Sequence, residues 1–294
     1  MILVVSLSPA WQRTLVFDKI IPGKVNRARH VSETASGKGV NVARVAAILG
    51  AEVRLLTVAG GARGRLLKGQ LQRQRFGARV VSVEAETRIC QTLLGNGEAT
   101  ELVEEAGLLR ANEVQEVLRA FAAEVRKAQL VVLTGTVPKG SDGSFYARLV
   151  GESQRRGVRV LIDAQKAQLQ NALKKQPFLV KINRDELAAV AHVRGAQWAV
   201  ITDGAKTVHV TDGSSERPLI IKPPRVRARN PIGSGDAMLA GIAVELLKGR
   251  PMVEAVRLGV ACGAANAMTL EPGFVRLADV KRLYSTLNKR VLIV

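Results

Sequence analysis

A glycine-rich loop followed directly by an apolar run carries the residue types that phosphoryl transfer needs. Gly233, Ser234 and Gly235 stand just before Asp236, and the apolar run 237–247 follows at once. Glycines let several N–H groups turn toward one point at a helix start, where the backbone carries partial positive charge. Such a loop can hold an anion, and a neighbouring carboxylate can accept the proton of an attacking hydroxyl. The pattern predicts an anion site with Asp236 as general base, and the alternative is a helix start that Asp236 caps.

The composition is that of a globular protein with a strongly basic surface. The chain has 294 residues, of which 47% are hydrophobic and 3% aromatic, and its formal net charge is +19. We expect no membrane span, because no run of about 18 uncharged apolar residues occurs. The two cysteines, Cys90 and Cys262, argue against a disulfide framework and fit a reducing cytoplasm. The excess positive charge could bind the phosphates of nucleic acid. However, the chain has few aromatic side chains that could stack on bases, so we favour a surface that attracts small phosphorylated molecules.

Short apolar runs alternate with segments of helical periodicity along the chain. The alternation predicts an α/β fold, with a mainly parallel sheet covered on both faces. The expected strands are 2–7, 55–59, 130–134, 158–163, 178–182 and 199–202. Helical spacing occurs in 114–125, in 145–150 and after Pro251. Segments 14–34 and 87–101 interrupt the alternation, and their polar–apolar pattern is typical of extended or loop-rich chain.

Five further motifs accompany the glycine loop in a familiar order. They are 36–44 (SGKGVNVAR), 86–90 (ETRIC), 134–140 (TGTVPKG), 181–187 (KINRDEL) and 202–205 (TDGA). Together with 230–241 they resemble the ribokinase-like (PfkB) carbohydrate kinases, above all the branch of 1-phosphofructokinase and tagatose-6-phosphate kinase. The resemblance covers nearly the whole chain. It implies one domain over 1–294, built as a three-layer α/β/α sandwich with a small β-sheet lid from about 12–34 and 87–101.

The resemblance implies ATP- and Mg²⁺-dependent phosphorylation of a ketohexose phosphate to a bisphosphate. The substrate would be of the fructose 1-phosphate or tagatose 6-phosphate type, with Asp236 as base and the three loop amides stabilising the transferring group. The implied nucleotide-binding residues are Asn183, Thr202, Gly204 and Asn266. Glu186 is implied to organise Mg²⁺ through water, since Mg²⁺ keeps several waters. The alternatives are a helix start capped by Asn183, with Glu186 in its first turn, and plain helix packing for Asn266.

The motifs on the sugar side imply a second group of binding residues. They are Gln12, Arg27, Gly37, Lys38, Gly39, Asn41, Arg88 and Lys139. Four of these are basic, which favours a sugar that already carries a phosphate. Gln12 stands where this branch usually has an aspartate, which leaves the choice of sugar open. The short connection 184–198, and Thr207 in place of a glycine of the nucleotide loop, put the ATP contacts in question.

The implied partners are ATP and a small sugar phosphate in the cytoplasm, without membrane association. A homodimer contact through the lid is a further implication of the resemblance. Two alternatives stay open: a kinase of another alcohol, such as an unphosphorylated sugar or a nucleoside, and a non-catalytic relative that binds nucleic acid. Arg88 and Lys139 count against the first alternative, while Gln12 and the short connection keep the second one open.

Overall fold

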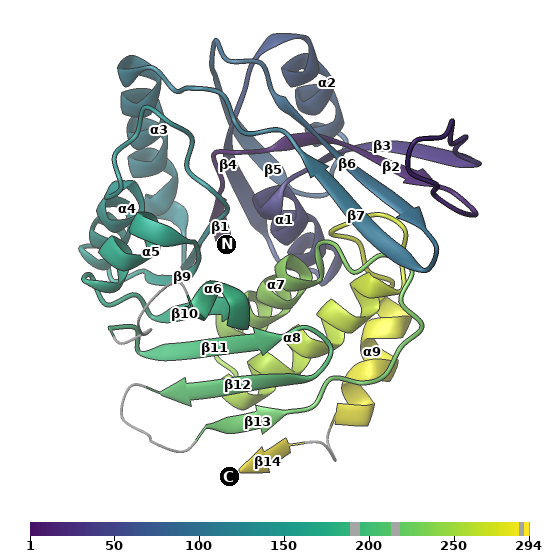
Figure 1. Cartoon of the computed structure of the whole chain (residues 1–294). Helices are drawn as coiled ribbons and strands as arrows, with labels where there is room; N and C mark the ends of the chain where they lie inside the picture. The colour runs from purple at the N-terminus through teal and green to yellow at the C-terminus, as the bar shows by residue number, and fades with distance from the viewer. Residues whose placement is uncertain (189–194, 213–217, 288–290, 294) are drawn as a thin grey trace.

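The computed structural model of the chain describes residues 1–188, 195–212, 218–287 and 291–293, which form two separate sheets (Figure 1). The larger sheet contains β1 (Ile2–Val5), β4 (Val53–Ala59), β5 (Gly77–Ser82), β8 (Leu130–Thr134), β9 (Arg159–Asp163), β10 (Leu179–Asn183), β11 (Trp198–Asp203), β12 (Thr207–Asp212), β13 (Leu219–Ile221) and β14 (Val291–Ile293). In this described part of the chain it is 10-stranded, in the order β14-β13-β12-β11-β10-β9-β8-β1-β4-β5. Neighbours run parallel from β5 to β11 and antiparallel from β11 to β14.

The six strands expected from the sequence are confirmed, and all of them lie in the parallel part of this sheet. Successive side chains of a strand point to opposite faces. In β1, Ile2 and Val4 therefore pack into one hydrophobic cluster, while Leu3 and Val5 pack into another. Both faces of the sheet are covered, which explains why these strands are apolar throughout instead of alternating.

Helices cover the two faces of the large sheet, as the sequence predicts (Figure 1). One face carries α1 (Lys38–Ile48), α2 (Gly61–Leu71), α7 (Ser234–Leu247), α8 (Met252–Ala267) and α9 (Leu277–Thr286). The other face carries α3 (Ala111–Glu124), the short 3₁₀ helix η1 (Val125–Lys127), α4 (Phe145–Gln154) and α5 (Lys166–Leu173). A Cβ atom on Gly241 would lie 2.9 Å from the Cα of Gly259, so two glycines allow α7 and α8 to approach closely.

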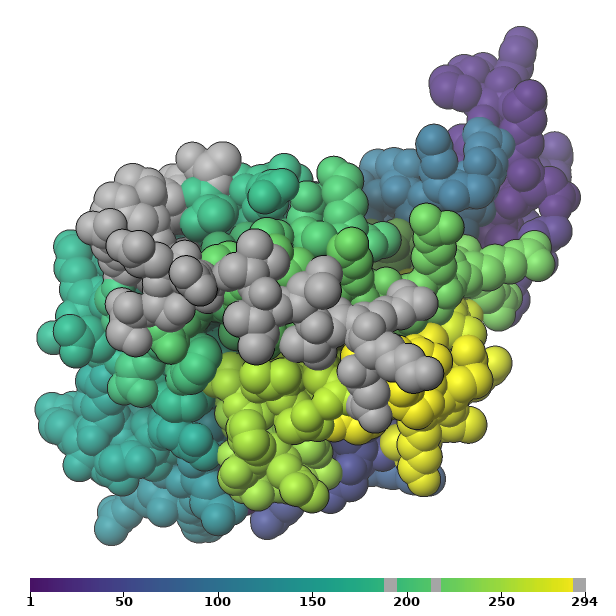
Figure 2. Space-filling view, turned by 90° about the horizontal axis from the view of Figure 1, so that it is seen from below, coloured from purple at the N-terminus to yellow at the C-terminus, as the bar shows by residue number. Residues whose placement is uncertain are grey.

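The smaller sheet is made of the two segments that interrupt the α/β alternation. Its order is β3-β2-β6-β7, formed by β2 (Ala10–Val16), β3 (His30–Ser36), β6 (Arg88–Gly95) and β7 (Glu98–Val103). β2 pairs antiparallel with β3 and parallel with β6. The sheet stands out from the body, as purple and blue atoms in Figure 2. We call it the lid sheet.

Two expectations from the sequence concern a membrane span and the short connection after β10. No helix in the described ranges is long and apolar enough to cross a membrane. The short connection 184–198 begins with α6 (Arg184–Ala188), but residues 189–194 lie outside the described part of the chain.

Candidate active site

The residues with chemical potential gather where the parallel strands end. Asp163 is the last residue of β9 and Asn183 is the last residue of β10. Helices α1 and α7 contact each other, and Asn41 near the start of α1 hydrogen-bonds Asp236 near the start of α7. Open α/β sheets bind ligands at the carboxyl ends of their strands. The predicted anion loop therefore lies at the edge where such sheets hold their substrates.

The anion loop has the backbone geometry that its glycines suggest. Gly233 is the N-cap of α7 and takes a left-handed conformation with φ 81°. A Cβ atom there would lie 2.7 Å from the Gly273 nitrogen, so this position requires glycine. The N–H of Ser234 donates to the Pro231 carbonyl at 3.1 Å. Among the described backbone hydrogen bonds none uses the N–H of Gly233 or Gly235, so two of the three predicted donors are available to an anion.

Asp236 lies within the first turn of α7 and is only 6% exposed. Its Oδ2 accepts a hydrogen bond of 2.8 Å from Nδ2 of Asn41. Among the described hydrogen bonds its carboxylate makes none that caps the helix, so the capping alternative does not describe this residue. Burial raises the pKa of Asp236 to about 6, against the opposing influence of the Lys38 charge. The carboxylate is therefore ionised at neutral pH and is a stronger base than a free aspartate.

A buried carboxylate holds two ammonium groups beside this base. Asp163 is 1% exposed, and its Oδ1 and Oδ2 accept from Nζ of Lys38 at 2.8 Å and Nζ of Lys181 at 2.7 Å. Burial alone would raise the pKa of Asp163, but the two lysines outweigh it and hold that pKa well below its usual range. Burial likewise opposes the charge on Lys38, yet Asp163 and Asp236 raise its pKa above the ordinary value. A Cβ atom on Gly235 would lie 3.1 Å from Nζ of Lys181, so this ammonium adjoins the anion loop.

The sequence interpretation missed Asp163 and Lys181. A signal for Lys181 was present, because a lysine inside the apolar strand 179–183 requires a buried counter-charge. Asp163 is the last residue of another apolar strand, and its carboxylate is a candidate for that counter-charge. Their contact depends on β9 and β10 being neighbours in the sheet, which the local pattern does not specify.

The sugar-side residues are placed in different environments. Gln12 is 3% exposed, and its Nε2 donates to Oγ1 of Thr92 at 2.9 Å within the lid sheet. Arg88 donates from its two terminal nitrogens to the backbone carbonyls of Ser8 and Glu104, each at 3.0 Å. Arg88 thereby fastens the lid sheet to the body. Its predicted phosphate contact stays a prediction.

The other two basic residues predicted on the sugar side, Arg27 and Lys139, are exposed. Lys38, by contrast, reaches the ion cluster beside Asp236. Gly37 is the N-cap of α1 with φ 103°, and a Cβ atom on it would lie 3.0 Å from Cα of Pro9. A Cβ atom on Gly39 would lie 2.3 Å from Cβ of Ser6. Both glycines allow α1 to approach β1 and the loop after it, and their predicted contact with a sugar stays a prediction.

Asn183 and Glu186 form the helix start that was the alternative to a metal site. Oδ1 of Asn183 accepts from the N–H of Glu186 at 2.7 Å, and Oε2 of Glu186 accepts from the N–H of Asn183 at 3.1 Å. Among the described residues, no group of three or more His, Cys, Asp or Glu side chains could hold a metal. A carboxylate offers about four lone-pair sites, so Glu186 still fits Mg²⁺ that is bound through water. Thr202 pairs with Asn183 across β10 and β11, and Gly204 lies exposed in the following turn with φ 51°.

Asn266 tethers the anion loop from behind. It is 0% exposed, its Nδ2 donates to the carbonyl of Ile232 at 2.8 Å, and its Oδ1 accepts from the N–H of Gly273 at 2.8 Å. Both the nitrogen and the oxygen of the side-chain amide therefore hydrogen-bond to backbone groups of the protein. Its contacts fit the packing alternative, in which Asn266 supports the loop, and its predicted nucleotide contact stays a prediction.

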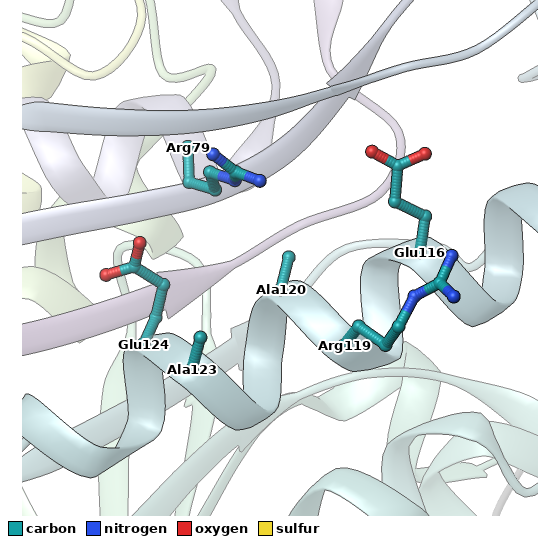
Figure 3. A pocket seen from close by; sticks show the side chains of 6 residues that line it. All are labelled: Arg79, Glu116, Arg119, Ala120, Ala123 and Glu124. Carbon is teal, nitrogen blue, oxygen red and sulfur yellow. The ribbon is translucent and has the colours of Figure 1, made fainter.

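A hollow of about 450 Å³ lies elsewhere, between β5 and α3, where Arg79 of the strand faces Glu124 of the helix (Figure 3). Its lining combines two arginines with two glutamates, and Glu124 also pairs with Arg54 at 3.4 Å. The charges of this hollow are therefore balanced within the protein. It contributes nothing to the cluster around Asp236.

Comparison with known proteins identifies the family and the fold of the chain. The model of the pfkB family carbohydrate kinases matches residues 2–274. Phosphofructokinase-2 from Escherichia coli, solved in complex with fructose-6-phosphate, is 25% identical with a TM-score of 0.86, over 98% of this chain and 99% of that chain. A possible 1-phosphofructokinase from Thermotoga maritima is 22% identical with a TM-score of 0.89, over 100% of this chain and 99% of that chain. These likenesses confirm the predicted ribokinase-like fold.

Proposed function

Because the chain belongs to the pfkB family of carbohydrate kinases, we propose that it transfers the γ-phosphoryl group of ATP to a ketohexose phosphate. The acceptor is of the fructose 1-phosphate or tagatose 6-phosphate type, and the product is a bisphosphate. One observation carries the proposal. A buried carboxylate, Asp236, adjoins the anion loop at the start of α7 and is flanked by the ammonium group of Lys38.

Asp236 acts as the general base. It accepts the proton of the sugar hydroxyl as the new O–P bond forms, while the bond between the γ-phosphorus and the ADP oxygen breaks and ADP keeps the electron pair. A pKa of about 6 keeps the carboxylate ionised at neutral pH, yet makes it more basic than a free aspartate. A positioned base of this kind contributes roughly 10²–10⁴ in rate.

The anion loop and Lys181 stabilise charge on the transferring group. The N–H groups of Gly233 and Gly235, which have no acceptor among the described residues, are fixed in place by the start of α7, so they need no reorganisation during the reaction. Nζ of Lys181 adjoins this loop and is itself held by Asp163. Mg²⁺, when bound with ATP, supplies further neutralisation of phosphate charge. Glu186 would hold it through water, next to Asn183 and Thr202.

The acceptor is proposed to be phosphorylated because the sugar side is rich in positive charge. Lys38 lies beside the base, and Arg88 joins the lid sheet to the body through the Ser8 carbonyl. Gln12 distinguishes this chain from the branch it resembles. Since Nε2 of Gln12 already donates to Thr92 and to the Arg13 carbonyl, this amide offers a sugar hydroxyl less than a free aspartate would.

The test is an ADP-release assay with the purified parent and Asp236→Asn. The panel contains fructose 1-phosphate, tagatose 6-phosphate, fructose 6-phosphate and the unphosphorylated sugars. We expect turnover with a sugar phosphate and a fall in kcat of at least about 100-fold in the variant. Asp142→Asn, at an exposed aspartate, is the matched control. An Asp236→Asn protein as active as the parent would refute the assignment of the base, and a preference for unphosphorylated sugars would refute the acceptor.

A further inference from the structure

A line of buried hydrogen bonds leads from the lid sheet to the proposed base. Oγ of Ser36 and Oδ1 of Asn41 are 2.9 Å apart, and Nδ2 of Asn41 donates to Oδ2 of Asp236 at 2.8 Å. The three residues are 2%, 3% and 6% exposed. An ionised carboxylate can only accept, so Asn41 must present its nitrogen to Asp236 and its oxygen to Ser36. The Ser36 hydroxyl must then donate.

We propose that Ser36 and Asn41 are positioning residues for Asp236, with Ser36 holding Asn41 and Asn41 holding the carboxylate. This inference rests on the proposed function, in which Asp236 is the base. The described hydrogen bonds of Asp236 engage Oδ2. With Oδ2 fixed, the carboxylate presents Oδ1 to the acceptor hydroxyl in a constant orientation. A base oriented by a further group behind it recurs in enzymes that activate hydroxyl nucleophiles.

Ser36 is fixed at the junction between the lid sheet and the body. It is the last residue of β3 and pairs with Ala10 of β2. The preceding residue, Ala35, accepts from the buried guanidinium of Arg44 through its carbonyl and donates its N–H to Gln70. Arg44 also donates to the Pro272 carbonyl. The orienting hydroxyl therefore keeps a defined place relative to α1 and the anion loop.

The charged groups that face Asp236 come from three other elements. They are Lys38 of α1, Lys181 of β10 and Asp163 of β9. Both lysines are paired with Asp163, so a change at Ser36 leaves their partners in place. Burial raises the pKa of Asp236, and the Asn41 hydrogen bond opposes that effect. Loss of the Ser36 hydroxyl frees the Asn41 amide to turn, which weakens its bond to the carboxylate and raises the pKa of Asp236 further.

Two variants remove the hydroxyl, Ser36→Ala and Ser36→Gly, and Ser32→Ala is the matched control. Ser32 lies in the same strand, and the described hydrogen bonds include none from its side chain. A net hydrogen bond of ~0.5–1.5 kcal/mol corresponds to a fall in kcat of about twofold to thirteenfold. It also corresponds to a rise of roughly 0.4–1.1 units in the apparent pKa of the acid limb of the kcat–pH profile. We expect both effects in both Ser36 variants, with KM for the sugar phosphate unchanged.

A second readout does not depend on turnover. Infrared titration of protein labelled with ¹³C-aspartate, with Asp236→Asn as the subtraction, follows the ionisation of Asp236 directly. A raised midpoint in both Ser36 variants, but not in Ser32→Ala, supports the inference. An unchanged midpoint overturns it, and so does a rise in KM at constant kcat, which would make Ser36 a binding residue. If the parent phosphorylates no sugar, the proposed function fails, while the infrared midpoint still decides whether Ser36 controls Asp236.

Discussion

Neutralising Asp236 should stabilise the protein while it lowers kcat. The pKa of this carboxyl rises from 3.8 to about 6 on folding because burial disfavours its charge. A difference of about 2 units corresponds to about 3 kcal/mol, at 1.36 kcal/mol per unit. Asp236→Asn removes the charge and keeps an oxygen that can accept from Asn41. We therefore expect the variant to gain about 3 kcal/mol in its free energy of unfolding at pH 7.

The pH dependence of this gain gives the sharper measurement. The folded-state pKa exceeds the unfolded one, so the folded protein binds the proton more tightly, and the ionised carboxylate costs stability. The cost is absent well below pH 3.8, develops between about pH 4 and pH 6, and is complete above that range. Urea unfolding of the parent and Asp236→Asn across pH 4–8 should show a difference that is small at pH 4 and has levelled off by pH 7.

Asp142→Asn provides a control of opposite sign. Hydrogen bonds from Ser144 lower the pKa of Asp142, which is exposed. The ionised form stabilises the fold there, so this variant should be less stable than the parent from about pH 4 upward, and the difference should shrink only below pH 3.8. If the free-energy difference between the parent and Asp236→Asn stayed constant from pH 4 to pH 8, Asp236 would not be desolvated as the structure indicates. The account of its basicity would then be wrong.

Three further perturbations test the same site. In the parent, kcat should fall as pH drops through about 6, because protonated Asp236 cannot accept the hydroxyl proton; a profile that is flat from pH 5 to pH 8 would contradict this. Asp163→Asn leaves the ammonium group of Lys181 buried without its counter-charge. Urea unfolding should therefore show a loss of about 3 kcal/mol in the free energy of unfolding. An unchanged urea midpoint would contradict the pairing. Gly233→Ala places a Cβ atom 2.7 Å from the Gly273 nitrogen on a residue with φ 81°. The variant should therefore lose about 1–3 kcal/mol in its free energy of unfolding and show a lower kcat. Parent-like kinetics would show that the loop geometry is not needed.

The parallel core could be predicted because its signal is local. An apolar run such as 130–134 contains, within itself, the reason for becoming a strand buried on both faces. The same holds for the anion loop, where Gly233 and the apolar helix after it are adjacent in the chain. The segments of the lid sheet were visible only as interruptions of the alternation. Their pairing, β2 between β3 and β6, depends on contacts between distant parts of the chain.

The partners of the site residues could not be predicted, because they come from distant segments. Lys38 and Asp163 are 125 positions apart, and Asn41 and Asp236 are 195 apart. Their contacts exist only because strand ends and helix starts meet at one edge of the sheet. Asn266 shows the converse case. The resemblance implied a nucleotide contact for Asn266, which stays a prediction, and the structure adds that its amide satisfies backbone groups of Ile232 and Gly273.

The charge balance of the cluster suits the direction of the proposed reaction. Before transfer, the ammonium groups of Lys38 and Lys181 face the carboxylates of Asp163 and ionised Asp236. When Asp236 takes the proton, one negative charge disappears and the cluster becomes net positive. The sugar oxygen has by then bonded to phosphorus, and the anionic phosphoryl group has moved to the acceptor. The buried cluster therefore gains its attraction for anions as the new phosphate ester forms, and because the site is poorly solvated, that attraction is stronger than it would be in water.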